Sequence, residues 1–250
     1  MLRVQQLVKY FGGVHAVDGV SFEVAAGECV ALIGPNGAGK STCFSCIAGQ
    51  YALTGGDISW NGQSLQGLAP AERLRQGVAR TFQVAQVFEA LTVLQNVQLA
   101  LQAAIGPGAI SAFKSLDGRS RPAASALLRQ TGMEALAGAD VLSLSYGAKK
   151  RLELALALAG SPQLLLLDEP AAGLAEEERA SLMQLVKRLV GQGMAVLYTE
   201  HNMDAVAGVA DRVLVMIEGR LAAQGGFEEV SRDATVRRLY LGEGEGAAHA

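Results

Sequence analysis

The sequence predicts an α/β fold in which a mainly parallel sheet is covered by helices on both faces. Apolar segments of strand length alternate with segments of helical periodicity, for example the strand at 28–34, the helix at 176–190 and the strand at 194–201. A glycine-rich turn separates the first of these strands from a helix that ends near residue 49. Such alternation is typical of βαβ units, whose crossover helices cover both faces of a parallel sheet.

Local turn signals place most of the other elements. Asn-Gly at 61–62 and Glu-Gly at 218–219 each predict the turn of a hairpin between two strands. A proline opens a short helix over 70–75. The Gly- and Ser-rich segment 105–121 has mixed polarity, so we expect a long connection within a helical insert there.

The composition limits the functions that need to be considered. Of the 250 residues, 50% are hydrophobic and 18% are charged, against roughly 25% charged in an average soluble domain, so we expect some apolar surface to face a partner. No apolar run approaches the roughly 20 residues that span a bilayer. The first residues lack the apolar core of a secretory signal, so we expect an unexported protein. A net charge of −3 gives no basic footprint for nucleic acid, and we expect no such partner.

The three cysteines agree with a reducing compartment, because they cannot form a complete disulfide framework. Cys43 and Cys46 form a C-x-x-C, which would suit a redox pair or half of a zinc site. However, no second pair is present, and the three histidines, His15, His201 and His249, are scattered along the chain. We therefore interpret the pair as small buried residues on a helix.

The segment GPNGAGKST, at 34–42, fits the phosphate-binding pattern G-x-x-x-x-G-K-[ST] and lies between a predicted strand and a predicted helix. Gly37 and Gly39 allow backbone N–H groups to curl around phosphates, and the helix N-terminus adds the positive end of its dipole. We expect Lys40 to reach the β- and γ-phosphates, and the Ser41 hydroxyl to bind Mg²⁺. The candidate nucleotide-binding residues of this loop are Gly34, Pro35, Asn36, Gly37, Ala38, Gly39, Lys40, Ser41 and Thr42.

Four leucines at 164–167 lead directly into two adjacent acids, Asp168 and Glu169. Ligands of parallel sheets lie beyond the carboxyl ends of the strands, so we expect this strand to deliver both acids beside the phosphates held by the neighbouring strand–loop–helix unit. Asp168 suits a second-sphere hold on Mg²⁺, and Glu169 can polarise a water for attack on the γ-phosphate. Together with the phosphate loop, the acids predict a P-loop NTPase.

A third segment, LSYGAKKRLELALA at 144–157, carries unusual charges at a predicted helix start. Ser145 is placed to be the N-cap, and Lys149, Lys150 and Arg151 follow in the first turns, where the helix dipole normally favours acids. An anion that docks at this terminus would explain the cations, and a basic solvated helix face is the alternative. The chain has no N-K-x-D motif of a GTPase, and a metabolic P-loop kinase would have no use for this helix.

The segments GPNGAGKST, ARTFQ, LSYGA, LLLLDEP and YTEHN occur in the order and spacing of an ABC-transporter ATP-binding subunit, and the chain resembles this family over nearly its whole length. The resemblance implies ATP and Mg²⁺ as cofactors. It also implies a P-loop NTPase (RecA-like) core with an N-terminal antiparallel β subdomain and a helical signature subdomain. The expected boundaries are 1–85 and 160–227 for the core with its β subdomain, 86–159 for the helical signature subdomain and 228–250 for a C-terminal extension.

The resemblance also implies roles for single residues. Phe11 corresponds to the aromatic residue that stacks on adenine, Gln83 to the glutamine that contacts Mg²⁺ and the attacking water, and His201 to the switch residue that holds the γ-phosphate. Glu169 corresponds to the catalytic base and Asp168 to the acid that holds the metal. The signature residues, which reach across a head-to-tail dimer to the ATP of the other subunit, correspond to Ser145, Tyr146 and Gly147.

Apolar residues follow Gln83 closely. They either form a groove for a helix of a membrane subunit or pack inside the helical insert, and the sequence leaves both possibilities open. These residues are Val84, Val87, Phe88 and Leu91.

Finer resemblance, in FGGVHAVDGVSFEV, RTFQ, LSYG, DEPAAGL and RRLYLGE, is to the ATPases of branched-chain (hydrophobic) amino acid importers. It implies two membrane-spanning permease subunits, a second related ATP-binding subunit, and indirectly a binding protein outside the membrane. The chain would then lie peripherally on the cytoplasmic face of the inner (plasma) membrane. Urea or amide importers and the lipopolysaccharide-export ATPase are the alternatives. A soluble ABC ATPase without a transport role is a further one.

Two positions depart from the wider ABC pattern. Ala148 stands where the signature usually has glutamine, and Ala175 stands where the loop after the catalytic acid often has aspartate. That aspartate ordinarily contacts the opposite subunit, so we expect an asymmetric heterodimer in which the partner supplies what is missing, with a homodimer as the alternative. Glu169, His201 and Gln83 are all present, so we expect the site on this phosphate loop to hydrolyse ATP.

Overall fold

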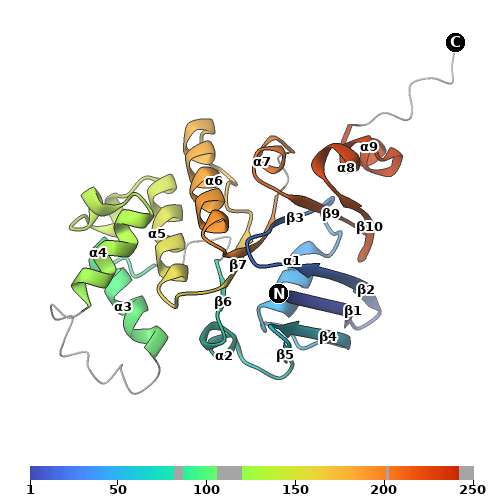
Figure 1. Cartoon of the computed structure of the whole chain (residues 1–250), viewed down its shortest axis with the longest axis horizontal. Coiled ribbons are helices and arrows are strands. Elements are labelled where there is room, and N and C mark those ends of the chain that lie inside the picture. The colour runs from blue at the N-terminus through green and yellow to red at the C-terminus, as the bar shows by residue number, and fades with distance from the viewer. Residues whose placement is uncertain (82–86, 106–119, 201–202, 242–250) are drawn as a thin grey trace, which may run out of the picture.

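The computed structural model describes residues 1–81, 87–105, 120–200 and 203–241, which form two β-sheets with helices around and between them (Figure 1). The larger sheet has the strand order β10-β9-β3-β8-β7-β6, and all of its neighbouring pairs are parallel except β10 with β9. The prediction of an α/β fold with a mainly parallel sheet is thus confirmed. Its strands are β3 (Cys29–Ile33), β6 (Val78–Arg80), β7 (Leu164–Asp168), β8 (Ala195–Thr199), β9 (Arg212–Ile217) and β10 (Arg220–Gly225).

The smaller sheet is antiparallel, with the strand order β2-β1-β4-β5. The hairpin predicted at 61–62 joins its last two strands, and the hairpin predicted at 218–219 joins β9 to β10, so both turn predictions are confirmed. The strands of this sheet are β1 (Leu2–Phe11), β2 (Val14–Val24), β4 (Gly55–Trp60) and β5 (Gln63–Ser64).

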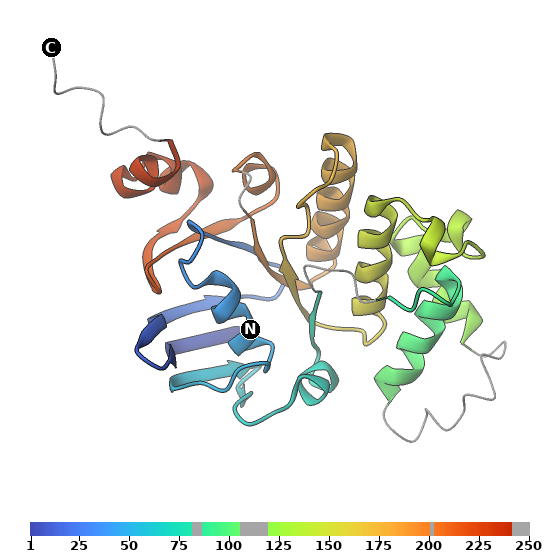
Figure 2. The same ribbon diagram turned by 180° about the vertical axis from the view of Figure 1, so that it is seen from behind.

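Helices cover the sheets in separate groups. Figure 1 and Figure 2 show α3, α4 and α5 gathered at one end of the molecule, and α8 and α9 beyond β9 and β10 at the other. The predicted helices over 70–75 and 176–190 are confirmed, whereas most of the expected connection over 105–121 lies outside the described residues. The helices are α1 (Lys40–Ile47), α2 (Pro70–Arg75), α3 (Val93–Ile105), α4 (Arg121–Gln130), α5 (Tyr146–Leu158), α6 (Glu176–Gly191), α7 (Met203–Ala207), α8 (Phe227–Arg232) and α9 (Ala234–Leu241), with short 3-10 turns at Glu134–Leu136 and Val141–Ser143.

The leucine run of β7 is explained by burial on both faces of the parallel sheet. Leu164 and Leu166 point into one hydrophobic core, and Leu165 and Leu167 point into another on the opposite face. Successive side chains of a strand alternate between faces, so a strand with two covered faces requires an unbroken apolar run. Such a run holds the strand firmly, and it fixes the position of the acidic residue at its end.

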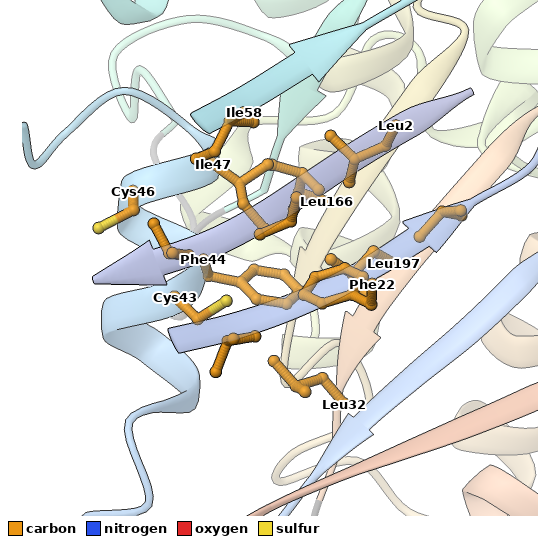
Figure 3. Close-up of a cluster of buried hydrophobic side chains, with 14 of the residues drawn as sticks. Leu2, Phe22, Leu32, Cys43, Phe44, Cys46, Ile47, Ile58, Leu166 and Leu197 are labelled. Atoms are coloured by element: carbon orange, nitrogen blue, oxygen red, sulfur yellow. The ribbon is translucent and has the colours of Figure 1, made fainter. Parts of the chain in front are cut away.

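The first core fills the space between the two sheets, with α1 in the middle (Figure 3). Phe44 of α1 lies among Phe22, Leu32 and Leu197, which come from three different strands. The two cysteines of α1 are fully buried in the same core, which confirms that they are small packing residues. Burial raises the pKa of the Cys43 thiol well above its usual range and that of Cys46 to about 11.

A third, smaller core holds α3, α4 and α5 together. Val93 and Val97 of α3 meet Leu128 of α4 and Leu152 of α5, all fully buried. The face of α5 that does not join this core reaches the second core through Leu154 and other residues, so α5 connects the helical group to the parallel sheet. In the parts of the chain that the structure describes, no helix combines the length and apolarity needed to cross a membrane.

The packing predicts a strong contrast between two phenylalanines. Phe44 is fully buried, and truncating it to alanine leaves a cavity between the sheets, so Phe44→Ala should lower the free energy of unfolding by roughly 3–5 kcal/mol. Phe88 is 59% exposed, so the matched Phe88→Ala should change the free energy of unfolding by less than about 0.5 kcal/mol. Urea denaturation followed by circular dichroism measures both. Equal effects would contradict this description of the core.

Candidate functional site

The phosphate loop runs between β3 and α1, where the sequence predicts it. Buried Ile33 ends the strand, and the chain turns through Gly34 and Gly39 before Lys40 begins the helix. Both glycines adopt positive φ, 153° and 96°, and a Cβ on Gly34 would collide with the carbonyl oxygen of Met216, one on Gly39 with that of Ala16. Glycine is therefore required at both positions for space as well as for conformation.

Lys40 is held against its own loop. Its ammonium donates hydrogen bonds to the carbonyl oxygens of Gly34, at 2.7 Å, and Pro35, at 3.0 Å. The side chain is only 6% exposed, and burial lowers the pKa of the ammonium, although the nearby carboxylates of Glu169 and Asp168 act in the opposite direction. The loop thus encloses a lysine whose charge faces the two acids.

A cavity of about 330 Å³ lies over the loop. Its wall contains most of the predicted phosphate-binding residues, one of the two predicted acids, and residues of β2 that the sequence analysis did not select. The lining residues are Val14, His15, Ala16, Asn36, Gly37, Ala38, Gly39, Lys40, Ser41, Thr42, Glu169 and Glu218.

The two acids follow the predicted strand, β7, but this strand has a different place in the sheet than expected. We expected it next to the strand of the phosphate loop, whereas β8 lies between β3 and β7. That detail of the prediction was wrong, because periodicity indicates strands without giving their order in the sheet. The prediction that both acids lie at the carboxyl edge holds, since Asp168 ends β7 in register with Thr199, which ends β8.

Thr199 bridges the two acids. Its hydroxyl donates a hydrogen bond to Oδ1 of Asp168 at 2.8 Å and accepts one from the backbone N–H of Glu169 at 2.9 Å. The other carboxylate oxygen of Asp168, Oδ2, accepts a hydrogen bond from the guanidinium of Arg80 at 2.7 Å. Asp168 is therefore buried with a donor on each oxygen.

Glu169 has an uncommon backbone conformation, with φ of 48°. A left-handed residue that is not glycine is costly and persists where its surroundings enforce it. Here the bond to Thr199 holds its N–H, and two residues later the N–H of Ala171 donates to the carboxylate of buried Glu200 at 3.0 Å. This turn brings the Glu169 side chain onto the cavity wall.

The donor set suits a hard cation that a bound phosphate helps to hold. Ser41 and Glu169 line the cavity, and Asp168 precedes Glu169 in the chain. These residues offer hydroxyl and carboxylate oxygen atoms, which Mg²⁺ prefers as ligands. Among the described residues, no group of three His, Cys, Asp or Glu side chains could hold a metal ion by itself. Mg²⁺ fits this site only with part of its coordination supplied by phosphate oxygens and water.

The signature segment begins α5, well apart from α1 in Figure 1. Ser145 caps the helix as predicted, because its hydroxyl accepts a hydrogen bond from the N–H of Ala148 at 3.2 Å. Tyr146 is 49% exposed, and its ring lies against Gly173. Gly147 lies against the carboxylate of Glu178, so this corner touches the segment that follows Asp168 and Glu169.

The explanation of the basic residues at this helix start needs correction. Lys150 is buried and forms an ion pair with Glu153, at 3.5 Å. Arg151 donates hydrogen bonds to the carbonyl oxygen of Thr131 and to the hydroxyl of Ser181. These two cations are therefore engaged within the chain, and the expectation that Lys150 awaits an external anion was wrong. A helical sequence alone does not reveal which charges face the interior.

The remaining predicted residues divide into described and undescribed ones. Phe11, at the end of β1, is 43% exposed and makes an edge-to-face contact with Tyr51 at 5.2 Å between ring centroids. Its neighbour Tyr10 stacks on His15, which lines the cavity. Three of the residues predicted to bind nucleotide, metal or a partner lie outside the described residues: Gln83, Val84 and His201.

The apolar residues after position 86 follow different courses. Val87 packs against the core of the helical group, Leu91 is half-buried, and Phe88 points outward with 59% of its surface exposed. Asn96 of α3 holds this loop, because its side chain accepts a hydrogen bond from the N–H of Phe88 and donates one to its carbonyl oxygen. Val87 thus packs inside the helical group, as one of the two alternatives expected, whereas its neighbour Phe88 stays exposed.

Sequence reasoning missed Thr199 and Arg80 as members of the site. Thr199 is the polar end of an otherwise apolar strand, a signal similar to the one that identified Asp168. Arg80 stands in the quoted segment ARTFQ, but its reach to Asp168 depends on the pairing of β6 with β7, which the sequence does not reveal.

Comparisons with known proteins agree with this geometry. Residues 17–172 match the family model described as ABC transporter. The high-affinity branched-chain amino acid transport ATP-binding protein LivG of Salmonella typhimurium is 38% identical, over 97% of this chain and 98% of its own. The ADP conformation of an ATP-binding cassette of an ABC transporter superposes with a TM-score of 0.86 at 31% identity, covering 97% of this chain and 99% of its own. A dimeric cassette bound to ADP and Pi gives 0.77 at 25% identity, covering 91% and 99%.

Two glycines of the loop provide a matched test of its geometry. Gly39→Ala should destabilise the protein by several times as much as Gly37→Ala, because a methyl group on Gly39 meets the backbone at Ala16 whereas one on Gly37 meets open space. Gly37→Ala still places alanine at φ of 81°, at a cost of about 1 kcal/mol. Free energies of unfolding from urea titration compare the two variants. A larger loss for Gly37→Ala would refute the described backbone of the loop.

Proposed function

The chain belongs to the ABC transporter family, and from this premise we propose that it is the ATP-hydrolysing motor subunit of an ABC importer for branched-chain or other hydrophobic amino acids. The observation that carries the ATPase part is the meeting of Lys40 and Glu169 on one cavity over the phosphate loop. The solute rests on the relative LivG, whose similarity extends over 97% of this chain. Urea or amide import and lipopolysaccharide export are the competing assignments.

We assign the loop residues 34–42 to the phosphates of ATP. The backbone N–H groups of the loop and the N-terminus of α1 supply partial positive charge to the phosphate oxygens. Lys40, already poised beside its own loop carbonyls, exchanges these neutral acceptors for charged phosphate oxygens when the nucleotide enters. Burial makes this exchange favourable, because the ammonium gains a charged partner in a site of low dielectric constant.

The catalytic step is assigned to Glu169, which accepts a hydrogen bond from a water and orients it toward the γ-phosphate. Thr199 positions this residue through its backbone N–H and at the same time orients Asp168. Mg²⁺, when bound with ATP, neutralises phosphate charge, and Ser41, Asp168 and Gln83 are the residues assigned to hold it. Asp168 would do so through a metal-bound water.

Three further assignments come from the family resemblance. Phe11 would stack on the adenine, His201 would hold the γ-phosphate, and Gln83 would contact Mg²⁺ and the attacking water. For Phe11, support comes from its exposed ring at the end of β1, next to Tyr10, which stacks on His15 of β2 beside the cavity.

The proposed assembly is a head-to-tail dimer with two ATP molecules between the subunits, like the dimeric cassette described above. Ser145, Tyr146 and Gly147 would contact the ATP of the opposite subunit, since they lie apart from the chain's own phosphate loop (Figure 1). We propose a related ATPase as the partner, a pair of permease subunits in the membrane, and a binding protein that delivers the solute. The chain would lie peripherally on the cytoplasmic face of the membrane.

For the organisation of the chain we propose the three units expected from the sequence. Residues 1–85 and 160–227 would form the ATP-binding core with its β subdomain, residues 86–159 the helical signature subdomain, and residues 228–250 the C-terminal extension. The separate core of α3, α4 and α5 supports the second unit. ATP-driven closure of the dimer would pull on the permeases, and hydrolysis would release it.

The role of Glu169 is tested by Glu169→Gln in the assembled complex. The substitution removes the base but keeps the shape, so ATPase turnover should fall by about 10²- to 10⁴-fold while ATP still binds. Gel filtration with Mg-ATP should show a dimer that persists. Glu228→Gln, at an exposed position of α8, is the matched control and should leave turnover unchanged. Full turnover in Glu169→Gln would refute the assignment of the base.

The transport role is tested by purifying the tagged chain from detergent-solubilised native membranes and identifying its companions by mass spectrometry. Two multi-spanning proteins and a second, similar ATPase should accompany it. If the membrane proteins that accompany it belong to a urea importer or a lipopolysaccharide exporter, that solute replaces the amino acid in the assignment. Recovery of the chain alone, or with ribosomal proteins, would contradict the transport role and leave the ATPase assignment standing.

A further inference from the structure

Arg80 connects three elements around the acidic end of β7. It ends β6, the edge strand of the parallel sheet, in register with Leu166 and thus two residues before Asp168. One guanidinium nitrogen donates to Oδ2 of Asp168 at 2.7 Å. The second terminal nitrogen, Nη1, donates to the Ser45 hydroxyl of α1 at 3.2 Å and to Oε1 of Gln50, just beyond α1, at 2.5 Å. The planar fork of arginine allows these contacts to be made at once.

The pair is sheltered from solvent, because the side chains of Arg80 and Asp168 are only 11% and 10% exposed. A sheltered carboxylate is unfavourable unless a positive charge or several donors compensate it. Arg80 is paired with Asp168, and Lys40 faces both Asp168 and Glu169, so these two acids are partly compensated before any nucleotide enters. Lys40 would turn to the phosphates of ATP, whereas Arg80 donates hydrogen bonds to Ser45 and Gln50 as well as to Asp168.

We propose that Arg80 is a positioning residue that orients Asp168 and balances its charge while Mg²⁺ is absent. The proposal rests on the proposed ATP and Mg²⁺ site. A bound Mg²⁺ would then act on the same carboxylate as Arg80, and their like charges would oppose each other. Arg80 thus stabilises the nucleotide-free protein and lowers the affinity for Mg²⁺.

The sign of the effect follows from these charges. Removing the guanidinium leaves Asp168 without its cation in the nucleotide-free protein, which should become less stable. A divalent cation then meets a less compensated carboxylate and one opposing positive charge fewer, so the metal should bind more tightly. A residue that only packs the site would change stability without changing the contribution of the metal to nucleotide binding.

The test compares the affinity for AMP-PNP, a non-hydrolysable ATP analogue, in excess magnesium chloride and in excess EDTA, by isothermal titration calorimetry on the full chain. For Arg80→Met the ratio of the two affinities should rise about tenfold over wild type, and the melting temperature without nucleotide should fall by roughly 5–10 °C. Arg80→Lys keeps the charge and loses the fork, so its ratio should stay within about twofold of wild type.

Arg73→Met is the matched control. Arg73 is likewise buried and donates hydrogen bonds to the carbonyl oxygens of Cys46 and Ile47 at the end of α1, so its loss should lower the melting temperature and leave the ratio unchanged. An unchanged or lower ratio in Arg80→Met would overturn the charge-balancing role. Absence of any effect of magnesium in the wild type would instead refute the proposed metal site, and this inference with it.

Discussion

The site depends on holding two adjacent carboxylates at a buried sheet edge although their negative charges repel each other. A buried acid is tolerated only when donors and positive charges surround it. Thr199 supplies the donor for Asp168, Arg80 supplies a cation, and Lys40 faces both acids from the phosphate loop. Because these groups come from β8, β6 and α1, the acids are stable only in the assembled sheet. The charged groups of the site therefore compensate one another only when the whole domain is folded.

The same constraint explains why the surroundings are so apolar. Water near the site would screen the attraction between Lys40 and the acids and would weaken the grip of the loop on phosphates. The leucines of β7 are buried on both faces, and α1 is enclosed between the two sheets. This packing fixes the ends of β3, β7 and β8 at one edge, where ligands of parallel sheets gather. Hydrophobic burial thus sets the geometry, and the charged groups use it.

The sequence predicts those parts of the site that depend on local order. The loop at 34–42 and the acids after β7 are contiguous patterns, and the hairpins at 61–62 and 218–219 follow from two-residue turns, so all four could be located without coordinates. Strand order could not be predicted, because β8 enters between β3 and β7 from a distant part of the chain. For the same reason Arg80 and Thr199 escaped notice. Their roles depend on which strands are neighbours.

The basic start of α5 shows a second limit of the sequence. Pattern reasoning treated Lys149, Lys150 and Arg151 alike, yet the structure pairs Lys150 with Glu153 and ties Arg151 to Thr131 and Ser181. Cations at that end oppose the helix dipole, and an internal carboxylate or carbonyl offsets the cost. The sign of a charge can be read from the sequence, whereas its partner cannot.

The departures at Ala148 and Ala175 affect different levels of structure. Position 148 contributes its backbone N–H to the cap of α5, which alanine supplies as well as glutamine does. Ala175 is the N-cap of α6 and gives no side-chain bond, where aspartate would be a favourable cap. Three consecutive glutamates, at 176–178, complement the dipole in the first turn instead. The start of α6 is thus stabilised within the chain although its N-cap offers no side-chain acceptor.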